Sequence, residues 1–211
     1  MLEIELRAIM CDAGRRLWQK GHVVASEGNL SCRLSPQRLL FTPSGMSKGH
    51  LKPNDLVITD MHGSVIGEGK VSSEYLMHLE VYRQRPDCQA VVHAHPLHAT
   101  ALAIAGESIP DLLTPEAVDV LGSVALAPFA MPGTLEVPAS IQPLLPDHRA
   151  ILLSHHGALC LGKSIEDALF RMETLERCAE LTFKVKQLGG IAKIPGAARR
   201  ALEIKLQDPS L

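Results

Sequence analysis

The stretch AILLSHHGALCLG, residues 150–162, has two apolar runs on either side of a short polar centre. This pattern is typical of two buried strands that meet at a turn. The run AVVHAH, residues 90–95, predicts a further buried strand, which ends before Pro96. Together these two stretches predict three strands of a central sheet.

The remaining segments follow an order of strands first and then mixed helices and strands. Helices are expected over 2–20, from Ser73 as N-cap to about Arg85, over 97–105, 115–121 and 134–145, from Ser164 to about Leu188, and in the tail 190–211; further strands are expected within 28–42, 56–60, 64–67 and 124–129. Without regular strand–helix–strand alternation, this order predicts an α/β protein of the α+β type, with a largely antiparallel mixed sheet flanked by helices. No composition break divides the chain, so we expect one domain, 1–211, with its core at about 4–185.

Composition excludes several classes of function. The net charge is -2 and aromatic residues make up only 3%, which disfavours binding to nucleic acid. The apolar runs are shorter than the ~18 residues of a membrane span, and acidic residues near the start argue against a signal peptide. The 5 cysteines include no CxxC pair, which indicates reduced thiols and predicts a cytoplasmic protein.

Two histidine clusters predict a metal site. His93 and His95 are two apart on a strand, so their side chains leave the same face. Imidazole is a common ligand for zinc and similar ions. A catalytic zinc takes about three protein ligands and keeps one position open. Either His155 or His156 can complete such a set, and the residues alone do not decide between them.

Three further segments have the composition of an anion pocket. In KVSSE, residues 70–74, two hydroxyls at a helix start offer a seat for phosphate, with Glu74 beside them. A carboxylate there also has a plainer use, in stabilising the helix dipole. The turns EGN, 27–29, and TPSG, 42–45, contain glycines that let the backbone approach an anion closely. Each turn alone is weak evidence.

Five motifs occur together in an order and spacing that resemble the class II aldolase/adducin family. They are ASEGNLS (25–31), FTPSG (41–45), GKVSSEYLMH (69–78), VVHAHPLHAT (91–100) and SHHGAL (154–159). The resemblance implies that His156 joins His93 and His95 as a metal ligand, and that Glu74 both contacts the metal and transfers the proton. It also implies a phosphate pocket made by Gly28, Asn29, Ser44, Gly45, Ser72 and Ser73.

The resemblance, strongest to the fuculose-1-phosphate aldolase branch of the family, implies an activity and an assembly. A metal-dependent aldolase of this kind cleaves a ketose 1-phosphate into dihydroxyacetone phosphate and an aldehyde through an enediolate that the metal stabilises. We expect one Zn²⁺ per chain, with Mn²⁺ or Co²⁺ as alternatives, and a homotetramer with its sites near subunit interfaces.

One departure from the family pattern leaves the reaction open. The fuculose-phosphate aldolases have a proton-donating tyrosine after an Ile-Pro dipeptide, but here the segment 109–122 has none, and no tyrosine follows Tyr82. Glu116 is the candidate replacement acid. A methylthioribulose-1-phosphate dehydratase or a pentulose-phosphate 4-epimerase therefore stays an alternative. A non-catalytic adducin-like module would lack the metal ligands that this sequence has.

Overall fold

One eight-stranded sheet organises residues 2–206, which are the residues that the computed structural model describes. The strands are β1 Asn29–Ser35, β2 Arg38–Phe41, β3 Val57–Asp60, β4 Val65–Ile66, β5 Ala90–Ala94, β6 Val124–Ala127, β7 Ala150–Leu153 and β8 Gly157–Gly162. Their order across the sheet is β4-β3-β2-β1-β5-β8-β7-β6. Neighbouring strands are antiparallel except β6 and β7, which are parallel. The predicted fold class is confirmed.

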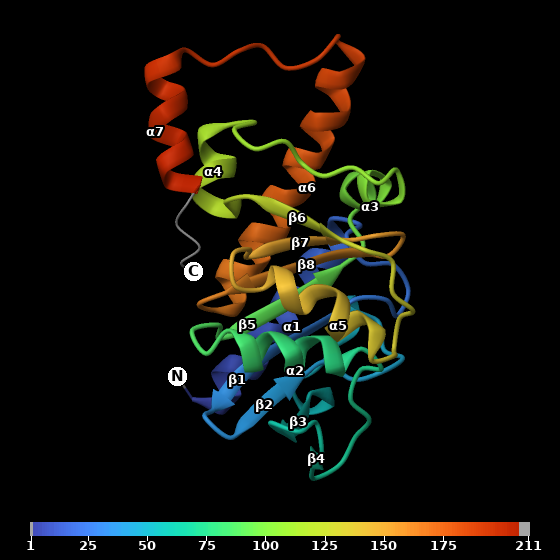
Figure 1. Cartoon of the computed structure of the whole chain (residues 1–211). Coiled ribbons are helices and arrows are strands. Elements are labelled where there is room, and N and C mark those ends of the chain that lie inside the picture. The colour runs from blue at the N-terminus through green and yellow to red at the C-terminus, as the bar shows by residue number, and fades with distance from the viewer. Residues whose placement is uncertain (1, 207–211) are drawn as a thin grey trace.

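Helices cover both faces of this sheet (Figure 1). They are α1 Glu3–Gln19, α2 Tyr75–Gln84, α3 Leu97–Ile104, α4 Pro115–Leu121, α5 Glu136–Ile141, α6 Ile165–Gln187 and α7 Gly196–Leu206. Helices α2 and α5 lie on the near face in Figure 1, and α1 and α6 lie on the far face. Short 3₁₀ segments at Lys48–His50, Pro53–Asp55 and Gln142–Leu144 complete the described elements, and the sequence pattern did not predict the first two.

The apolar core is divided by the sheet into two clusters. On β5, Ala90 and Val92 pack in the cluster that includes α1 and α6, whereas Val91 packs in the cluster that includes α2 and α5. Successive side chains of a strand point to opposite faces. His93 therefore lies on the face covered by α2, where it is fully buried.

Helix α2 begins later than the sequence predicted. Its first residue is Tyr75, and Glu74 stands at the N-cap without capping the helix through its side chain, so the assignment of Ser73 as N-cap is wrong. The reason is a short extended segment just before the helix. Val71 pairs with Pro43 in a β-bridge, and Ser44 N donates to the carbonyl of Lys70. Ser73 and Glu74 then form a turn, in which Tyr75 N donates to the carbonyl of Ser72 at 3.2 Å, and the helix begins one residue later than predicted.

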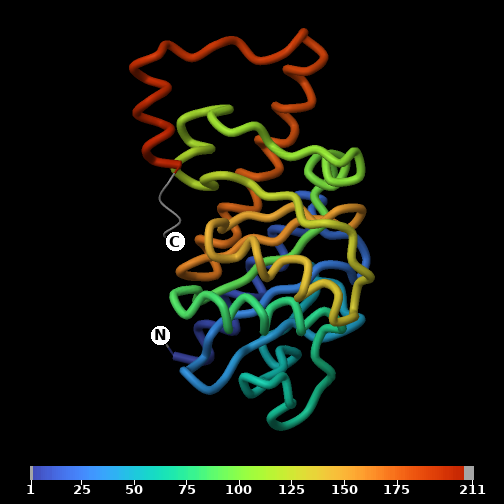
Figure 2. Tube along the Cα trace, viewed as in Figure 1, coloured from blue at the N-terminus to red at the C-terminus, as the bar shows by residue number. Residues whose placement is uncertain are grey.

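The C-terminal part of the chain extends away from the sheet (Figure 2). Helix α6 begins where predicted, because Ser164 Oγ accepts a hydrogen bond from Asp167 N at 3.1 Å. It continues past the sheet, and the chain then returns to α7, which packs beside α4 with Lys205 Nζ 2.6 Å from Asp119 Oδ1. Helix α7 confirms a helix in the tail, while residues 207–211 of the predicted tail lie outside the described residues.

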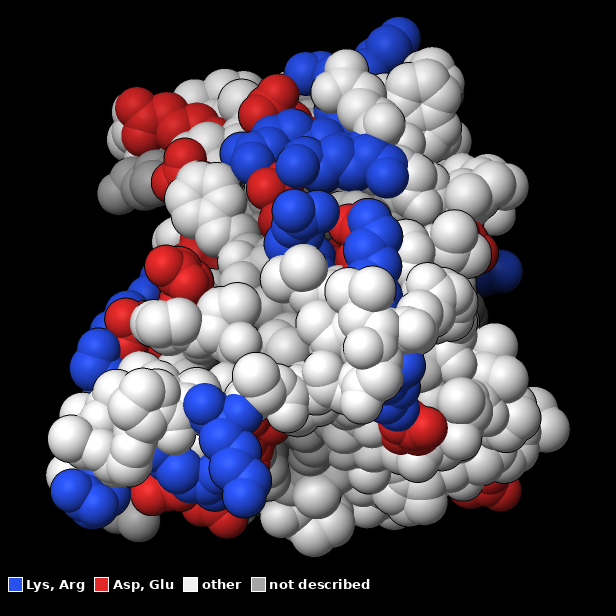
Figure 3. All heavy atoms as spheres, turned by 90° about the horizontal axis from the view of Figure 1, so that it is seen from above, with Lys and Arg blue, Asp and Glu red and all other residues white. Residues whose placement is uncertain are grey.

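The surface seen from above mixes both signs of charge (Figure 3). Lys and Arg side chains lie among Asp and Glu side chains, and a broad part of this face carries neither. In this view the Lys and Arg side chains gather in the upper centre and at the lower left, and Asp and Glu side chains lie next to both groups. Among the described helices, none has both the length and the apolar character needed to cross a membrane.

Candidate active site

The pairing of β1 with β5 brings the first site residues together. Asn29 lies opposite His93, and Ser31 lies opposite Val91. Residues directly opposite each other in an antiparallel pair have their side chains on the same face. Asn29, Ser31 and His93 therefore all point towards α2, and all three side chains are buried.

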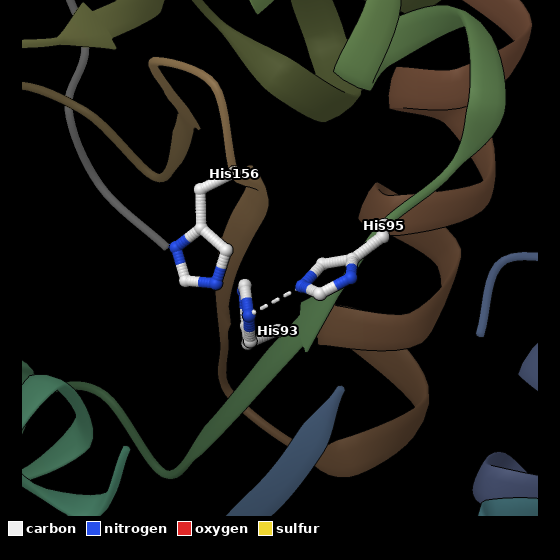
Figure 4. A group of neighbouring side chains, drawn as sticks. All are labelled: His93, His95 and His156. Carbon is white, nitrogen blue, oxygen red and sulfur yellow. Dashed lines mark hydrogen bonds between the residues drawn. The ribbon is translucent and has the colours of Figure 1, made fainter. Parts of the chain in front are cut away.

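Three imidazole rings converge beside the end of β5 (Figure 4). His93 and His95 come from this strand and the residue after it, and His156 comes from the turn between β7 and β8. The ring centroids are 4.7 to 5.1 Å apart. One nitrogen from each ring lies within 4.8 Å of the others, so the group can hold a metal ion.

The hydrogen bonds of two rings fix which nitrogen faces the centre of the group. His93 Nδ1 lies 2.9 Å from the carbonyl oxygen of Ala158, and His95 Nδ1 lies 3.0 Å from Glu27 Oε2. Both partners only accept hydrogen bonds, so both Nδ1 atoms carry the hydrogen, and each neutral ring has a lone pair at Nε2. These two Nε2 atoms are 3.0 Å apart. Two lone pairs that face each other at this distance fit a cation that both can bind.

The turn that presents His156 has a special backbone. His155 has φ of 55°, a left-handed conformation that is uncommon for residues other than glycine. Its side chain is exposed and packs edge-on against Phe129. Gly157 follows His156 in the chain. A Cβ at this position would lie 2.5 Å from His95 Cδ2 and 2.6 Å from the carbonyl of Ala94. The structure thus brings His156 to the cluster and directs His155 away from it.

Glu74 completes the cluster from the opposite side. Its Oε2 is 3.3 Å from His93 Nε2, and its Oε1 is 3.1 Å from His156 Nε2. Oε1 is buried and accepts no hydrogen bond from the described residues. Burial raises the pKa of this carboxyl, but His93 and His156, when they are protonated in the absence of a metal, outweigh that effect and hold the pKa well below its usual range. An ionised, under-coordinated carboxylate oxygen beside three imidazoles suits a divalent metal.

A chain of buried hydrogen bonds leads from Glu74 into the core. Asn29 Nδ2 donates to Glu74 Oε2 at 2.9 Å, and Asn29 Oδ1 accepts from His78 Nε2 at 2.5 Å. His78 Nδ1 then has to accept from Ser31 Oγ, 2.6 Å away, which leaves Ser31 to accept from the Tyr82 hydroxyl at 2.8 Å. Every donor therefore points towards Glu74. Burial lowers the pKa of His78 to about 3, so this ring is neutral.

The predicted phosphate residues share one cavity with the metal cluster. A cavity of about 290 Å³ is lined by Ser26, Glu27, Gly28, Asn29, Pro43, Ser44, Gly45, Lys48, Ser72, Ser73, Glu74, His95, Pro132, Gly133 and His156. Gly28 has φ of 69°, and a Cβ there would lie 2.5 Å from Val23 Cγ1. All six predicted phosphate residues are present. Glu116 is exposed on α4, outside this lining, so its role as an acid stays a prediction.

Sequence reasoning gave no role to two residues that the structure brings into this cavity. Glu27 accepts hydrogen bonds from His95 Nδ1 and from Val24 N, and so orients a candidate ligand. Lys48 extends its side chain beneath two of the turns. Glu27 belongs to the ASEGNLS motif, but nothing in the sequence signals a contact with a residue 68 positions away. Lys48 lies in a segment without any predicted element.

An antiparallel sheet with three imidazoles and a buried carboxylate at one strand end defines a protein with a candidate metal site. A family model for the class II aldolase and adducin N-terminal domain matches residues 8–183. The chain therefore belongs to this family, as the sequence motifs predicted, and class II aldolases are metal-dependent.

Relatives of more than one activity are similar to this chain. The 3-oxo-tetronate 4-phosphate decarboxylase of Haemophilus influenzae is 33% identical over 190 residues, 88% of this chain and 90% of that protein. The L-fuculose phosphate aldolase of Methanococcus maripaludis is 35% identical over 174 residues, 82% of this chain and 94% of that protein. The crystal structure of YgbL from Escherichia coli has a TM-score of 0.89 and 33% identity, covering 96% of this chain and 99% of that one.

Proposed function

We propose that this protein is a metal-dependent lyase that removes CO₂ from a 3-oxo-tetronate 4-phosphate and leaves dihydroxyacetone phosphate. The single observation that carries the proposal is the arrangement of Glu74, which lies between His93 and His156 in the same cavity as the predicted phosphate turns. His93, His95, His156 and Glu74 would hold the metal, with zinc favoured by three imidazoles and manganese or cobalt as alternatives.

Different residues of the cavity would act on the two ends of the substrate. A bound metal would supply Lewis-acid stabilisation of the negative charge that develops on the carbonyl and adjacent hydroxyl oxygens. Glu74 would move the proton to or from the carbon next to the carbonyl. The hydroxyls of Ser44, Ser72 and Ser73, with the backbone at Gly28 and Gly45, would bind the phosphate at the other end.

The chemistry of the leaving group favours decarboxylation. In a 3-oxo acid, the bond between the carboxylate carbon and C2 breaks, CO₂ leaves, and the electron pair stays on the enediolate, which takes up one proton at C2. The departing CO₂ needs no proton transfer at its oxygens. An aldol cleavage, in contrast, requires a group that takes the proton from the hydroxyl that becomes the aldehyde. The sequence has no tyrosine after Tyr82 to fill the role that the aldolase branch gives to that residue.

Aldol cleavage of a ketose 1-phosphate is the second candidate. It is supported by the similarity to the L-fuculose phosphate aldolase of Methanococcus maripaludis. Both reactions share the half that ends in dihydroxyacetone phosphate, and therefore the same role for Glu74 and the same phosphate turns. They differ only in the group that leaves.

Two assays distinguish the candidate reactions by the group that leaves, CO₂ or an aldehyde. The metal-loaded protein should release CO₂ from 3-oxo-tetronate 4-phosphate faster than it releases an aldehyde from L-fuculose 1-phosphate, each measured together with dihydroxyacetone phosphate. Aldehyde release that exceeds CO₂ release would replace the first proposal with the second. Absence of both, in protein with bound metal, would refute both.

Glu74→Gln directly tests the proton transfer that both candidate reactions share. This change keeps the size of the side chain and removes the group that accepts a proton. At matched metal content, exchange of deuterium from solvent into the hydroxymethyl group of dihydroxyacetone phosphate should fall by about 100-fold or more, the weight of a positioned acid–base group. Exchange that survives in this variant would assign the proton transfer to another residue.

We also propose a homotetramer with sites near the subunit interfaces, and a cytoplasmic location. Large apolar side chains on the surface support an assembly, among them Leu97, Phe129 and Leu135, which are 72%, 58% and 74% exposed. Sedimentation analysis at micromolar concentration should give four chains per particle. A fully active monomer would contradict this proposal.

A further inference from the structure

Lys48 is a buried lysine beneath two of the turns that line the cavity. Only 2% of it is exposed. Its Nζ donates to the carbonyl oxygens of Ser26 at 2.6 Å and Met46 at 2.7 Å. An ammonium group has three N–H donors, and residues 2–206 provide no third acceptor. One donor therefore stays available at the wall of the cavity.

The charge of Lys48 lacks a close partner of opposite sign within the described part of the chain. No carboxylate oxygen of residues 2–206 lies within 4.0 Å of its Nζ. The two carboxylates of the same cavity are engaged elsewhere, Glu27 with His95 and Glu74 with His93 and His156. Burying a cation against neutral carbonyls alone is costly. Consistent with this, burial lowers the pKa of Lys48 to about 8, although Glu27 and Glu74 oppose the effect.

Apart from a metal ion at the histidine cluster, the other groups around the phosphate turns supply hydrogen bonds but no lysine or arginine charge. Lys48 is the one lysine or arginine in the described lining of the cavity, which also contains Glu27 and Glu74. A phosphate monoester carries close to two negative charges at neutral pH, with a second pKa of about 6. Hydroxyls and backbone N–H groups alone would leave this charge beside two carboxylates. A dianion bound there needs a cation close by.

We propose that Lys48 is the cation that binds the phosphate of the substrate, with its third N–H donating to a phosphate oxygen. This inference rests on the proposed function only in assigning the turns around Ser44 and Ser72 to phosphate. It adds a residue that makes the pocket select a dianion over a neutral group. A merely structural role is the competing explanation, because Lys48 also ties the turn at Ser26 to the turn at Met46.

Direct binding of inorganic phosphate tests the inference without any turnover. Isothermal titration calorimetry on metal-loaded protein should show that Lys48→Met binds phosphate roughly 10- to 100-fold more weakly than the wild type, as expected for loss of a hydrogen bond to a charged group. Lys52→Met is the matched control, since Lys52 is an exposed lysine of the same loop, and it should bind phosphate as the wild type does. Lys48→Arg, which keeps the charge, should recover part of the affinity.

A second readout separates charge recognition from the structural role. Deuterium exchange is measured with dihydroxyacetone phosphate and with unphosphorylated dihydroxyacetone. If Lys48 binds phosphate, Lys48→Met should lower kcat/KM for the phosphate ester by roughly 10- to 100-fold and change it little for the free ketone. An equal loss for both would show that Lys48 only supports the turns, and would overturn the inference.

The outcomes also separate this inference from the proposed function. If the wild type binds phosphate and Lys48→Met binds it equally well, the inference about Lys48 fails, but the proposed phosphate pocket is still supported. If the wild type binds no phosphate at millimolar concentration, both fail. Should Lys48→Met prove too unstable to purify, Lys48→Gln gives the same comparison, because it keeps a donor for one carbonyl but no charge.

Discussion

Replacing His78 tests whether the buried hydrogen bonds behind Glu74 position that carboxylate. His78→Leu places an apolar side chain of similar size inside the core and removes both ring nitrogens. Asn29 Oδ1 and Ser31 Oγ then each lose a buried partner, at 2.5 and 2.6 Å respectively. Each such loss costs about 1–3 kcal/mol. Ser31 keeps its contact with Tyr82, so we expect the free energy of unfolding to fall by about 2–4 kcal/mol.

The effect on activity follows from the direction of the hydrogen bonds. Without His78, only Glu74 itself still orients the amide of Asn29, so this amide can rotate and its hydrogen bond to the carboxylate weakens. The hydrogen bond that is weakened joins a donor to a charged group and is worth about 1.5–3 kcal/mol when it is lost in full. At about 1.4 kcal/mol per tenfold change, kcat should fall by roughly 10- to 100-fold.

The assay is deuterium exchange into dihydroxyacetone phosphate at matched metal occupancy, beside chemical denaturation. Tyr82→Phe is the control, because it removes the outermost hydroxyl of the chain and leaves His78 and Asn29 in place. It should cost about 1 kcal/mol of stability and change exchange by less than about threefold. His78→Gln restores a donor towards Asn29 and should recover part of the rate. Exchange in His78→Leu within twofold of the wild type, or an equal loss in Tyr82→Phe, would refute the reasoning.

Three further predictions concern the metal, the turn and the thiols. His156→Ala should lose most of the bound metal by elemental analysis while His155→Ala retains it; the reverse result would exchange their roles. Gly157→Ala should be destabilised by about 1–3 kcal/mol in thermal unfolding, the usual cost of overpacking, because its Cβ would meet the ring of His95 at 2.5 Å; an unchanged midpoint would contradict this contact. Burial raises the pKa of Cys160 to about 12, so its thiol is protonated at pH 8, and Ellman's reagent should modify it only after denaturant is added.

The sequence was informative wherever a pattern depends on neighbours in the chain. The spacing of His93 and His95 on an apolar strand, and the two apolar runs around His155 and His156, were enough to predict their elements. The choice between the last two histidines required family resemblance, because the left-handed φ of His155 that separates them is not visible in residue types.

Features that depend on distant contacts were not predictable in the same way. The start of α2 was misplaced because a bridge between Val71 and Pro43 delays the helix, and this pairing joins segments 28 positions apart. The roles of Glu27 and Lys48 depend on where the turns meet in space. A glutamate and a lysine in loops have no sequence periodicity and no flanking motif that distinguishes them from ordinary surface residues.

The pairing of β1 with β5, and of β5 with β8, has a consequence for how the protein folds during its synthesis. The residues of the site lie at positions 29, 74, 93, 95 and 156, so no short segment contains more than two of them. Contacts of such long range form late and slowly in folding. During synthesis from the N-terminus, the third imidazole is added only after about three quarters of this sequence has been made. The growing chain is thereby kept from capturing metal with its full set of ligands until the sheet that orders them can close.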